Sequence, residues 1–264
     1  MIRMIRAVFL DVDGTLVSTR THLPSPRTAQ ALLRAKERGI LLFVATGRHT
    51  RIPEEGYIMD LLPDCFDGYV CLTGHYCFTR EGEVVLKQPL DPGDVGRTKE
   101  LARKLEIPYT YAYEDRVLIS RVNERVRRHN AGLELPIPEV GEMDAGRDVY
   151  AITLYVDREV EMERLRPLLH RSTTVSWTEG ITDVCSLEGG KQAGIEAMMA
   201  RFGLSPGEVM AVGDSGNDLT MLEHVGVPVA MGNGTAEVKA SAGYVTAACE
   251  EDGIYQAFAH FGLI

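Results

Sequence analysis

The sequence predicts an α/β protein whose core is a doubly wound parallel sheet, with an α+β domain inserted into it. Short continuous apolar runs at 7–10, 40–45 and 209–212 are each followed by a polar turn, which is typical of strands buried on both faces of a parallel sheet. Helical patterns alternate with these runs in the first and last thirds of the chain. Over residues 88–187 the pattern changes to shorter strands and helices, which indicates the insertion.

The first third of the chain predicts a strand, a helix and a second strand. Residues 4–10 end in four apolar residues and are expected to form the first, central strand. A helix is predicted over 24–39, because proline favours the first turn of a helix and glycine favours its end. Residues 40–45 give the second strand, and the runs at 67–73 and 76–87 suggest hairpins or edge strands.

The insertion is expected to be a separate α+β domain over residues 88–187. Prolines and glycines mark both of its boundaries. The partial alternation of apolar residues over 148–157 suits a sheet with one side facing solvent or a cleft. The expected strands are 109–112, 116–120, 149–156, 173–177 and 182–187, and the expected helices are 94–106, 122–131 and 159–170.

The alternation of strands and helices resumes after the insertion. Helices are expected at 190–202, 217–224 and 254–260, and strands at 209–212 and 227–231. Residues 1–87 and 188–264 are therefore expected to fold together as one core domain.

Composition and charge exclude several classes of function. The 264 residues are 45% hydrophobic and 25% charged, as in ordinary globular proteins. A net charge of −10 opposes binding to a phosphate backbone, so no nucleic-acid partner is expected. The five cysteines contain no C-x-x-C pair and indicate neither a disulfide framework nor a zinc site. Without a signal or membrane-spanning pattern, the expectation is a cytoplasmic protein with no membrane partner, as a monomer or weak oligomer.

Two acidic residues follow the first predicted strand. The segment Asp11-Val12-Asp13-Gly14-Thr15 places carboxylates at i and i+2, beyond the carboxyl end of the strand, where α/β proteins bind ligands. A calcium loop is the ordinary alternative for such a pattern. It fails here, because Leu16 stands where an EF-hand needs glycine and His22 where it needs glutamate.

Two further strand ends carry groups suited to phosphate or metal. Thr46-Gly47-Arg48 follows the second strand, where a hydroxyl and turn amides can hold a phosphate oxygen. Asp214 and Asp218 follow the strand at 209–212 and would add carboxylates at the same sheet edge, as metal ligands or their supports. Lys191 opens the helix before that strand, and on its own it would be expected at the surface.

Taken in order, these four elements resemble the four motifs of the haloacid dehalogenase superfamily. Segments 217–222, 229–233, 244–246 and 251–253 resemble the C-terminal half of its Cof-type phosphatases. Only 35 residues separate Asp11 from Thr46, whereas 143 separate Arg48 from Lys191, so the insertion resembles a C2 cap. Its strand-rich pattern is similar to the C2B type. The resemblance implies a Rossmann-like core with a C2B cap domain, and more loosely a relationship to bacterial sugar-phosphate phosphatases.

The resemblance also implies a chemistry. The chain would be a phosphatase that uses Mg²⁺ and forms an aspartyl-phosphate, with Asp11 as nucleophile and Asp13 as general acid and base. The implied metal ligands are the Asp11 carboxylate, the Asp13 backbone carbonyl and Asp214. The implied phosphate contacts are Thr46, Gly47, Lys191 and Asn217, while Asp218 would orient either Lys191 or a water molecule at the metal.

The substrate is expected to be a small phosphorylated metabolite, a hexose or pentose phosphate by resemblance. Candidates for selecting it are Arg48, Trp177, Asp183 and Glu188, and Trp177 could equally be a buried anchor. A sugar phosphomutase of the same fold and a non-catalytic sugar-phosphate sensor are the alternatives.

Two features depart from simple expectations. Cys249 stands where many Cof-type enzymes carry asparagine, which puts a minor structural contact in doubt. The segment Met231-Gly232-Asn233-Gly234 contains G-x-G after a strand, but it lacks the third glycine and the ribose-binding acid of a dinucleotide site.

Overall fold

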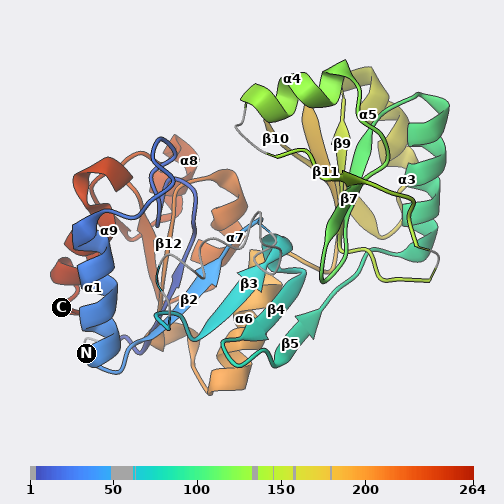
Figure 1. Cartoon of the computed structure of the whole chain (residues 1–264). Coiled ribbons are helices and arrows are strands. Elements are labelled where there is room, and N and C mark those ends of the chain that lie inside the picture. The colour runs from blue at the N-terminus through green and yellow to red at the C-terminus, as the bar shows by residue number, and fades with distance from the viewer. Residues whose placement is uncertain are drawn as a thin grey trace. The chain divides into compact units, whose positions relative to one another are not determined.

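The computed structural model describes residues 4–48, 62, 64–132, 136–144, 146–156, 159–178 and 180–264. The chain divides into two compact units. The first comprises the described residues within 1–50, 56–87 and 190–264, and the second those within 88–189. Figure 1 shows that each unit is built around its own sheet.

The first unit contains an eight-stranded sheet in the order β14-β13-β12-β1-β2-β3-β4-β5. β1 (Ala7–Leu10) is an inner strand, as predicted, and it pairs in parallel with β2 (Leu41–Ala45) and β12 (Val209–Gly213). The outer strands are β3 (Gly68–Cys71), β4 (Tyr76–Thr79), β5 (Val84–Lys87), β13 (Val227–Ala230) and β14 (Tyr244–Val245). Pairing is parallel from β14 to β3, and β4 and β5 join in antiparallel pairs.

Helices cover both faces of this sheet, which confirms the predicted doubly wound α/β class. α6 (Lys191–Phe202), α7 (Leu219–Leu222) and α8 (Ala236–Ser241) bury apolar side chains against Phe9 and Phe43. The alternate residues Val8 and Leu42 are fully buried on the opposite face. There α1 (Pro26–Glu37) packs against α9 (Gly253–His260). Short 3₁₀ turns complete the unit: η1 (Leu72–Gly74), η3 (Pro206–Glu208), η4 (Gly216–Asp218) and η5 (Cys249–Glu251).

The second unit is an α+β arrangement around a six-stranded sheet in the order β10-β11-β9-β6-β7-β8. Its strands are β6 (Tyr109–Ala112), β7 (Val117–Ile119), β8 (Glu139–Val140), β9 (Ala151–Tyr155), β10 (Ser172–Thr178) and β11 (Ile181–Ser186). Its helices are α3 (Pro92–Lys104), α4 (Glu124–Gly132) and α5 (Glu159–Leu165), followed by η2 (Arg166–Leu168). α3 and α5 pack on the face of Ile152 and Leu154, whereas Val126 of α4 contacts Ile119 and Ile181 of the other face.

Several elements differ from the sequence-based expectation. The runs at 67–73 and 76–87 form the predicted hairpins, since β3 pairs antiparallel with β4 and β4 with β5, but β3 is an interior strand and not an edge. The helix predicted over 159–170 ends as α5 at Leu165, since Pro167 lacks the N–H that a continuing helix would need. β8, α8 and β14 were not predicted, because segments of two to six residues are too short to establish a periodicity. None of the helices that the structure describes has the length and apolar content to span a bilayer.

One glycine lets α6 approach the sheet closely. A Cβ atom at Gly194 would overlap Val70 Cγ1 and lie 3.1 Å from Gly74 Cα. The missing side chain thus brings the first turn of α6, which begins at Lys191, against η1 and the end of β3.

We expect Gly194→Ala to destabilise the protein by about 1–2 kcal/mol, because overpacking of about 1–3 kcal/mol outweighs the gain in helix propensity. Gly96→Ala is the matched control, since Gly96 lies inside α3 and a Cβ atom there would meet no atom of the described residues within 4 Å. This variant should gain about 0.5–1 kcal/mol. Urea unfolding followed by circular dichroism measures the unfolding free energy of both variants. If Gly194→Ala stabilised the protein as much as Gly96→Ala does, the close approach of α6 would be contradicted.

Candidate active site

The ammonium of Lys191 is buried between two carboxylates. Its Nζ donates hydrogen bonds to Asp11 Oδ1 at 2.5 Å and to Asp218 Oδ1 at 2.6 Å, and the residue has no exposed surface. Burial alone would lower the pKa of Lys191, but the charges of Asp11 and Asp218 outweigh it and raise the pKa above its usual value. A residue that would be expected at the surface on its own is therefore a fixed positive charge at the ends of β1 and β12.

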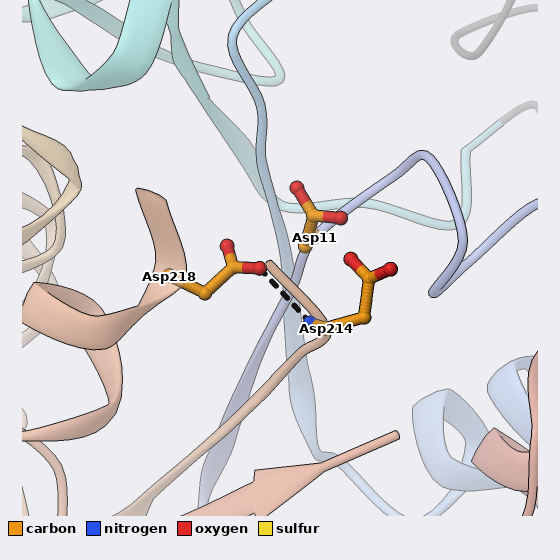
Figure 2. A group of neighbouring side chains, drawn as sticks. All are labelled: Asp11, Asp214 and Asp218. Carbon is orange, nitrogen blue, oxygen red and sulfur yellow. Dashed lines mark hydrogen bonds between the residues drawn. The ribbon is translucent and has the colours of Figure 1, made fainter. Parts of the chain in front are cut away.

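Asp218 is held by the turn that follows β12. Its Oδ2 accepts hydrogen bonds from the backbone N–H of Asp214 at 2.9 Å, drawn in Figure 2, and of Ser215 at 3.0 Å. Its Oδ1 accepts from Lys191. A side chain at Gly213 would lie 2.5 Å from the Asp218 carboxyl carbon, so glycine is needed for this turn. Because both oxygens are engaged, Asp218 is better suited to orienting Lys191 than to binding a metal.

The carboxylates of Asp11 and Asp214 lie next to one another (Figure 2). One oxygen from each of Asp11, Asp214 and Asp218 lies within 4.8 Å of the others. Burial and the Asp218 charge raise the pKa of Asp11 above its usual range and that of Asp214 to about 6. Asp214 Oδ1 is buried and has no hydrogen-bond partner among the described residues. The neighbouring carboxylate oxygens of Asp11 and Asp214 fit a Mg²⁺ ion, which prefers such hard ligands and would relieve their repulsion.

Asp13 lies two residues beyond Asp11 in the turn after β1, and its side chain is 41% exposed. Arg48 binds it in a bidentate ion pair, with Nε at 2.8 Å from Oδ2 and Nη2 at 2.7 Å from Oδ1. The paired geometry makes this one of the stronger kinds of hydrogen-bonded contact. Arg48, predicted as a candidate for substrate selection, thus contacts the predicted general acid in this structure.

The predicted phosphate contacts lie at the ends of β2 and β12. Thr46 is buried, and its hydroxyl oxygen accepts a hydrogen bond from the backbone N–H of Arg48 at 3.1 Å, which closes the turn around the exposed Gly47. Asn217 is exposed in η4, where its Oδ1 accepts from the Ser215 hydroxyl at 2.7 Å. The side-chain hydrogen bonds described for Thr46 and Asn217 are therefore within their own turns rather than to the acids.

The remaining selectivity candidates belong to the second unit. Asp183, in β11, accepts a hydrogen bond from the Thr153 hydroxyl at 2.7 Å, and the exposed Glu188 pairs with Arg171. Trp177 is a residue of β10, but its side chain lies outside the described part of the structure. The roles of these three residues in substrate selection stay predictions.

Sequence reasoning missed Asn233, which follows β13 at the same edge of the sheet. Its Nδ2 donates to Gly14 O at 2.8 Å and to Asp214 Oδ2 at 3.2 Å, and its Oδ1 accepts from the backbone N–H of Cys249 at 2.9 Å. The Cys249 thiol in turn donates to Thr15 O at 3.3 Å. The available signal was the position of Asn233 after a strand, between two glycines, which the failed dinucleotide pattern obscured.

The known proteins that this chain resembles include several phosphatases. BT1666 from Bacteroides thetaiotaomicron, described as a phosphatase of the haloalkanoate (HAD) enzyme superfamily, is 31% identical with a TM-score of 0.88, covering 99% of this chain and 96% of that one. The HAD subclass IIB sugar phosphatase BT4131 is 33% identical with a TM-score of 0.87, and the match covers 98% of this chain and 100% of that one. The pyridoxal phosphate phosphatase YbhA of Escherichia coli is 27% identical over 269 residues, 95% of this chain and 96% of its own.

A family model described as haloacid dehalogenase-like hydrolase matches residues 8–258. This match includes every strand end that carries an acid of the site. Over nearly its whole length, and in agreement with the resemblance seen in its motifs, the chain therefore belongs to the haloacid dehalogenase-like hydrolases.

Proposed function

We propose that this hydrolase is a Mg²⁺-dependent phosphatase that removes phosphate from small phosphomonoesters, chiefly sugar phosphates, through an aspartyl-phosphate on Asp11. The observation that carries the proposal is the buried Lys191 ammonium, fixed between Asp11 and Asp218 next to the carboxylate of Asp214. Family membership and the phosphatases among its relatives support a phosphoric monoester hydrolase. The sugar phosphatase BT4131 supports the substrate class.

Asp11 is suited to act as the nucleophile. Its Oδ1 is held by Lys191, which fixes the orientation of the carboxylate and favours its charged form. In the proposed reaction, a carboxylate oxygen attacks phosphorus in line, the ester P–O bond breaks, and the alcohol leaves with a proton from Asp13. Water then attacks phosphorus, Asp13 takes up its proton, and the bond between Asp11 and phosphorus breaks.

Mg²⁺ would be held by the carboxylates of Asp11 and Asp214 and by the backbone carbonyl of Asp13. When bound, it supplies positive charge that offsets the repulsion between the acids and a phosphate dianion. Each pair of like charges at 4 Å costs about 4 kcal/mol at an effective dielectric constant near 20. Among the described contacts of Asp11, Lys191 provides the only ammonium, so the charge of the ion is needed before a phosphate can approach.

The substrate phosphate is proposed to contact Lys191, Thr46, Gly47 and Asn217. A phosphate group can accept two parallel hydrogen bonds from a guanidinium, as a carboxylate does. We therefore expect it to compete with Asp13 for Arg48, which would release Asp13 for proton transfer. The second unit is proposed to be the C2B cap that selects the rest of the substrate.

The nucleophile and the general acid can be tested separately. We expect Asp11→Asn to abolish turnover, because an amide cannot form the acyl phosphate, and Asp13→Asn to lower kcat by about 10²–10⁴-fold. Asp144→Asn is a matched control, since Asp144 is a partly exposed acid of the second unit that pairs with Arg116. Free phosphate released from hexose, pentose and pyridoxal phosphates is the measurement. Full activity in Asp11→Asn would contradict the proposal, and isomerised sugar phosphate without free phosphate would indicate a mutase.

The metal can be tested by removing it. Treatment with excess EDTA should abolish phosphate release, and dialysis into Mg²⁺ should restore it, because the acids then regain their counter-charge. Circular dichroism before and after treatment controls for unfolding. Hydrolysis that survives excess EDTA would exclude a metal-dependent mechanism.

The raised pKa of Asp214, about 6, predicts a pH dependence of stability in EDTA. Between about pH 4 and 6 the folded protein holds a proton on Asp214 that the unfolded chain releases, so stability falls as pH rises through this window. Relative to Asp214→Asn, the wild type should lose about 2–3 kcal/mol of unfolding free energy between pH 4 and 7. Urea unfolding of both proteins measures the difference. A difference that is constant with pH would show that Asp214 is not destabilised by its surroundings.

A further inference from the structure

The side chain of Asn233 joins three segments that end at the same edge of the sheet. Its amide nitrogen donates to the backbone of the β1 turn at Gly14 and to Asp214 Oδ2, while its oxygen accepts from Cys249 in η5. Both N–H groups and one lone pair of the amide are therefore used. A single exposed side chain makes these three contacts without being an acid or a predicted ligand.

The contacts fix which way the amide points. Turning it over would place its oxygen against two other oxygens, Gly14 O and Asp214 Oδ2, and its nitrogen against the N–H of Cys249. The N–H of Asn233 is thus held on Oδ2 of Asp214. Oδ1, the oxygen that is buried and has no described hydrogen-bond partner, is left for another ligand.

The backbone conformation of the turn after β1 leaves room for the contact between Asn233 and Asp214. Gly14 has φ of +81°, and a Cβ there would lie 2.5 Å from Asp214 Oδ2 and 3.3 Å from Asn233 Nδ2. Only a residue without a side chain lets Asp214 and Asn233 come this close to the nucleophile's turn. The arrangement of the three residues is therefore built into the backbone.

We infer that Asn233 is a positioning residue for Mg²⁺: it engages one oxygen of Asp214 so that the other is presented to the ion. The inference rests on the proposed function, since it assigns a role at the same metal site. Asn233 itself touches neither the ion nor the substrate. Removal of groups that orient metal ligands typically weakens metal binding by about 10–100-fold.

The test is to strip the full chain of metal with EDTA, remove the EDTA, and measure Mg²⁺ affinity by calorimetric titration with MgCl₂. The wild type and Asn233→Ala are compared. The variant should bind Mg²⁺ about tenfold or more weakly. Gln256→Ala is the matched control, because the exposed Gln256 amide also donates to a backbone carbonyl of the first unit, that of Glu251, but contacts none of the three acids. Its Mg²⁺ affinity should equal that of the wild type.

Phosphate release separates positioning from a general loss of structure. At saturating Mg²⁺ the kcat of Asn233→Ala should return to within about threefold of the wild type, whereas at low Mg²⁺ it should fall by the ratio of the affinities. Unchanged Mg²⁺ affinity in Asn233→Ala, or equal weakening in Gln256→Ala, would overturn the inference while leaving the proposed function intact. Absence of Mg²⁺ binding to the wild type would overturn the proposed metal site, and the inference with it.

Discussion

The buried ion pairs of Lys191 are the interaction on which the rest of the site depends. They join residues 180 and 27 positions apart in the sequence, at the ends of β1 and β12 and at the start of α6. A buried ammonium that loses its partners costs several kcal/mol, so the start of α6 must be held close to the ends of β1 and β12. The close approach at Gly194 contributes to this, because it places the first turn of α6 against η1 and the end of β3.

This arrangement has an electrostatic consequence. Lys191 balances part of the charge of Asp11, Asp214 and Asp218, but burial and the remaining repulsion together raise the pKa of Asp11 and of Asp214. Such an imbalance is characteristic of a functional site rather than of a structural one. Parallel strands supply the groups: their carboxyl ends lie at one edge of the sheet, where each turn can add a side chain without disturbing the core. The proposed metal, the proposed phosphate contacts and Asn233 all follow from this geometry.

Much of the core could be predicted from the sequence, because strands buried on both faces leave uninterrupted apolar runs such as 7–10 and 209–212. The acids could be placed for the same reason, since each follows such a run. Lys191 was placed only through its resemblance to a motif, as burial of one lysine leaves no local signal. The pairing of Arg48 with Asp13 and the contacts of Asn233 could not be predicted. They depend on rotamers and on turns brought together from distant parts of the chain.

We propose that Asp11 carries the phosphoryl group during turnover, and trapping that intermediate tests this role most directly. Borohydride reduces an acyl phosphate to an alcohol, so adding it during hydrolysis of a sugar phosphate should convert Asp11 into homoserine. Peptide mass spectrometry would locate the change. We expect homoserine at position 11, formed only when substrate and Mg²⁺ are present and absent from Asp11→Asn. Steady turnover with an unmodified Asp11, or with the trapped group on another residue, would contradict it.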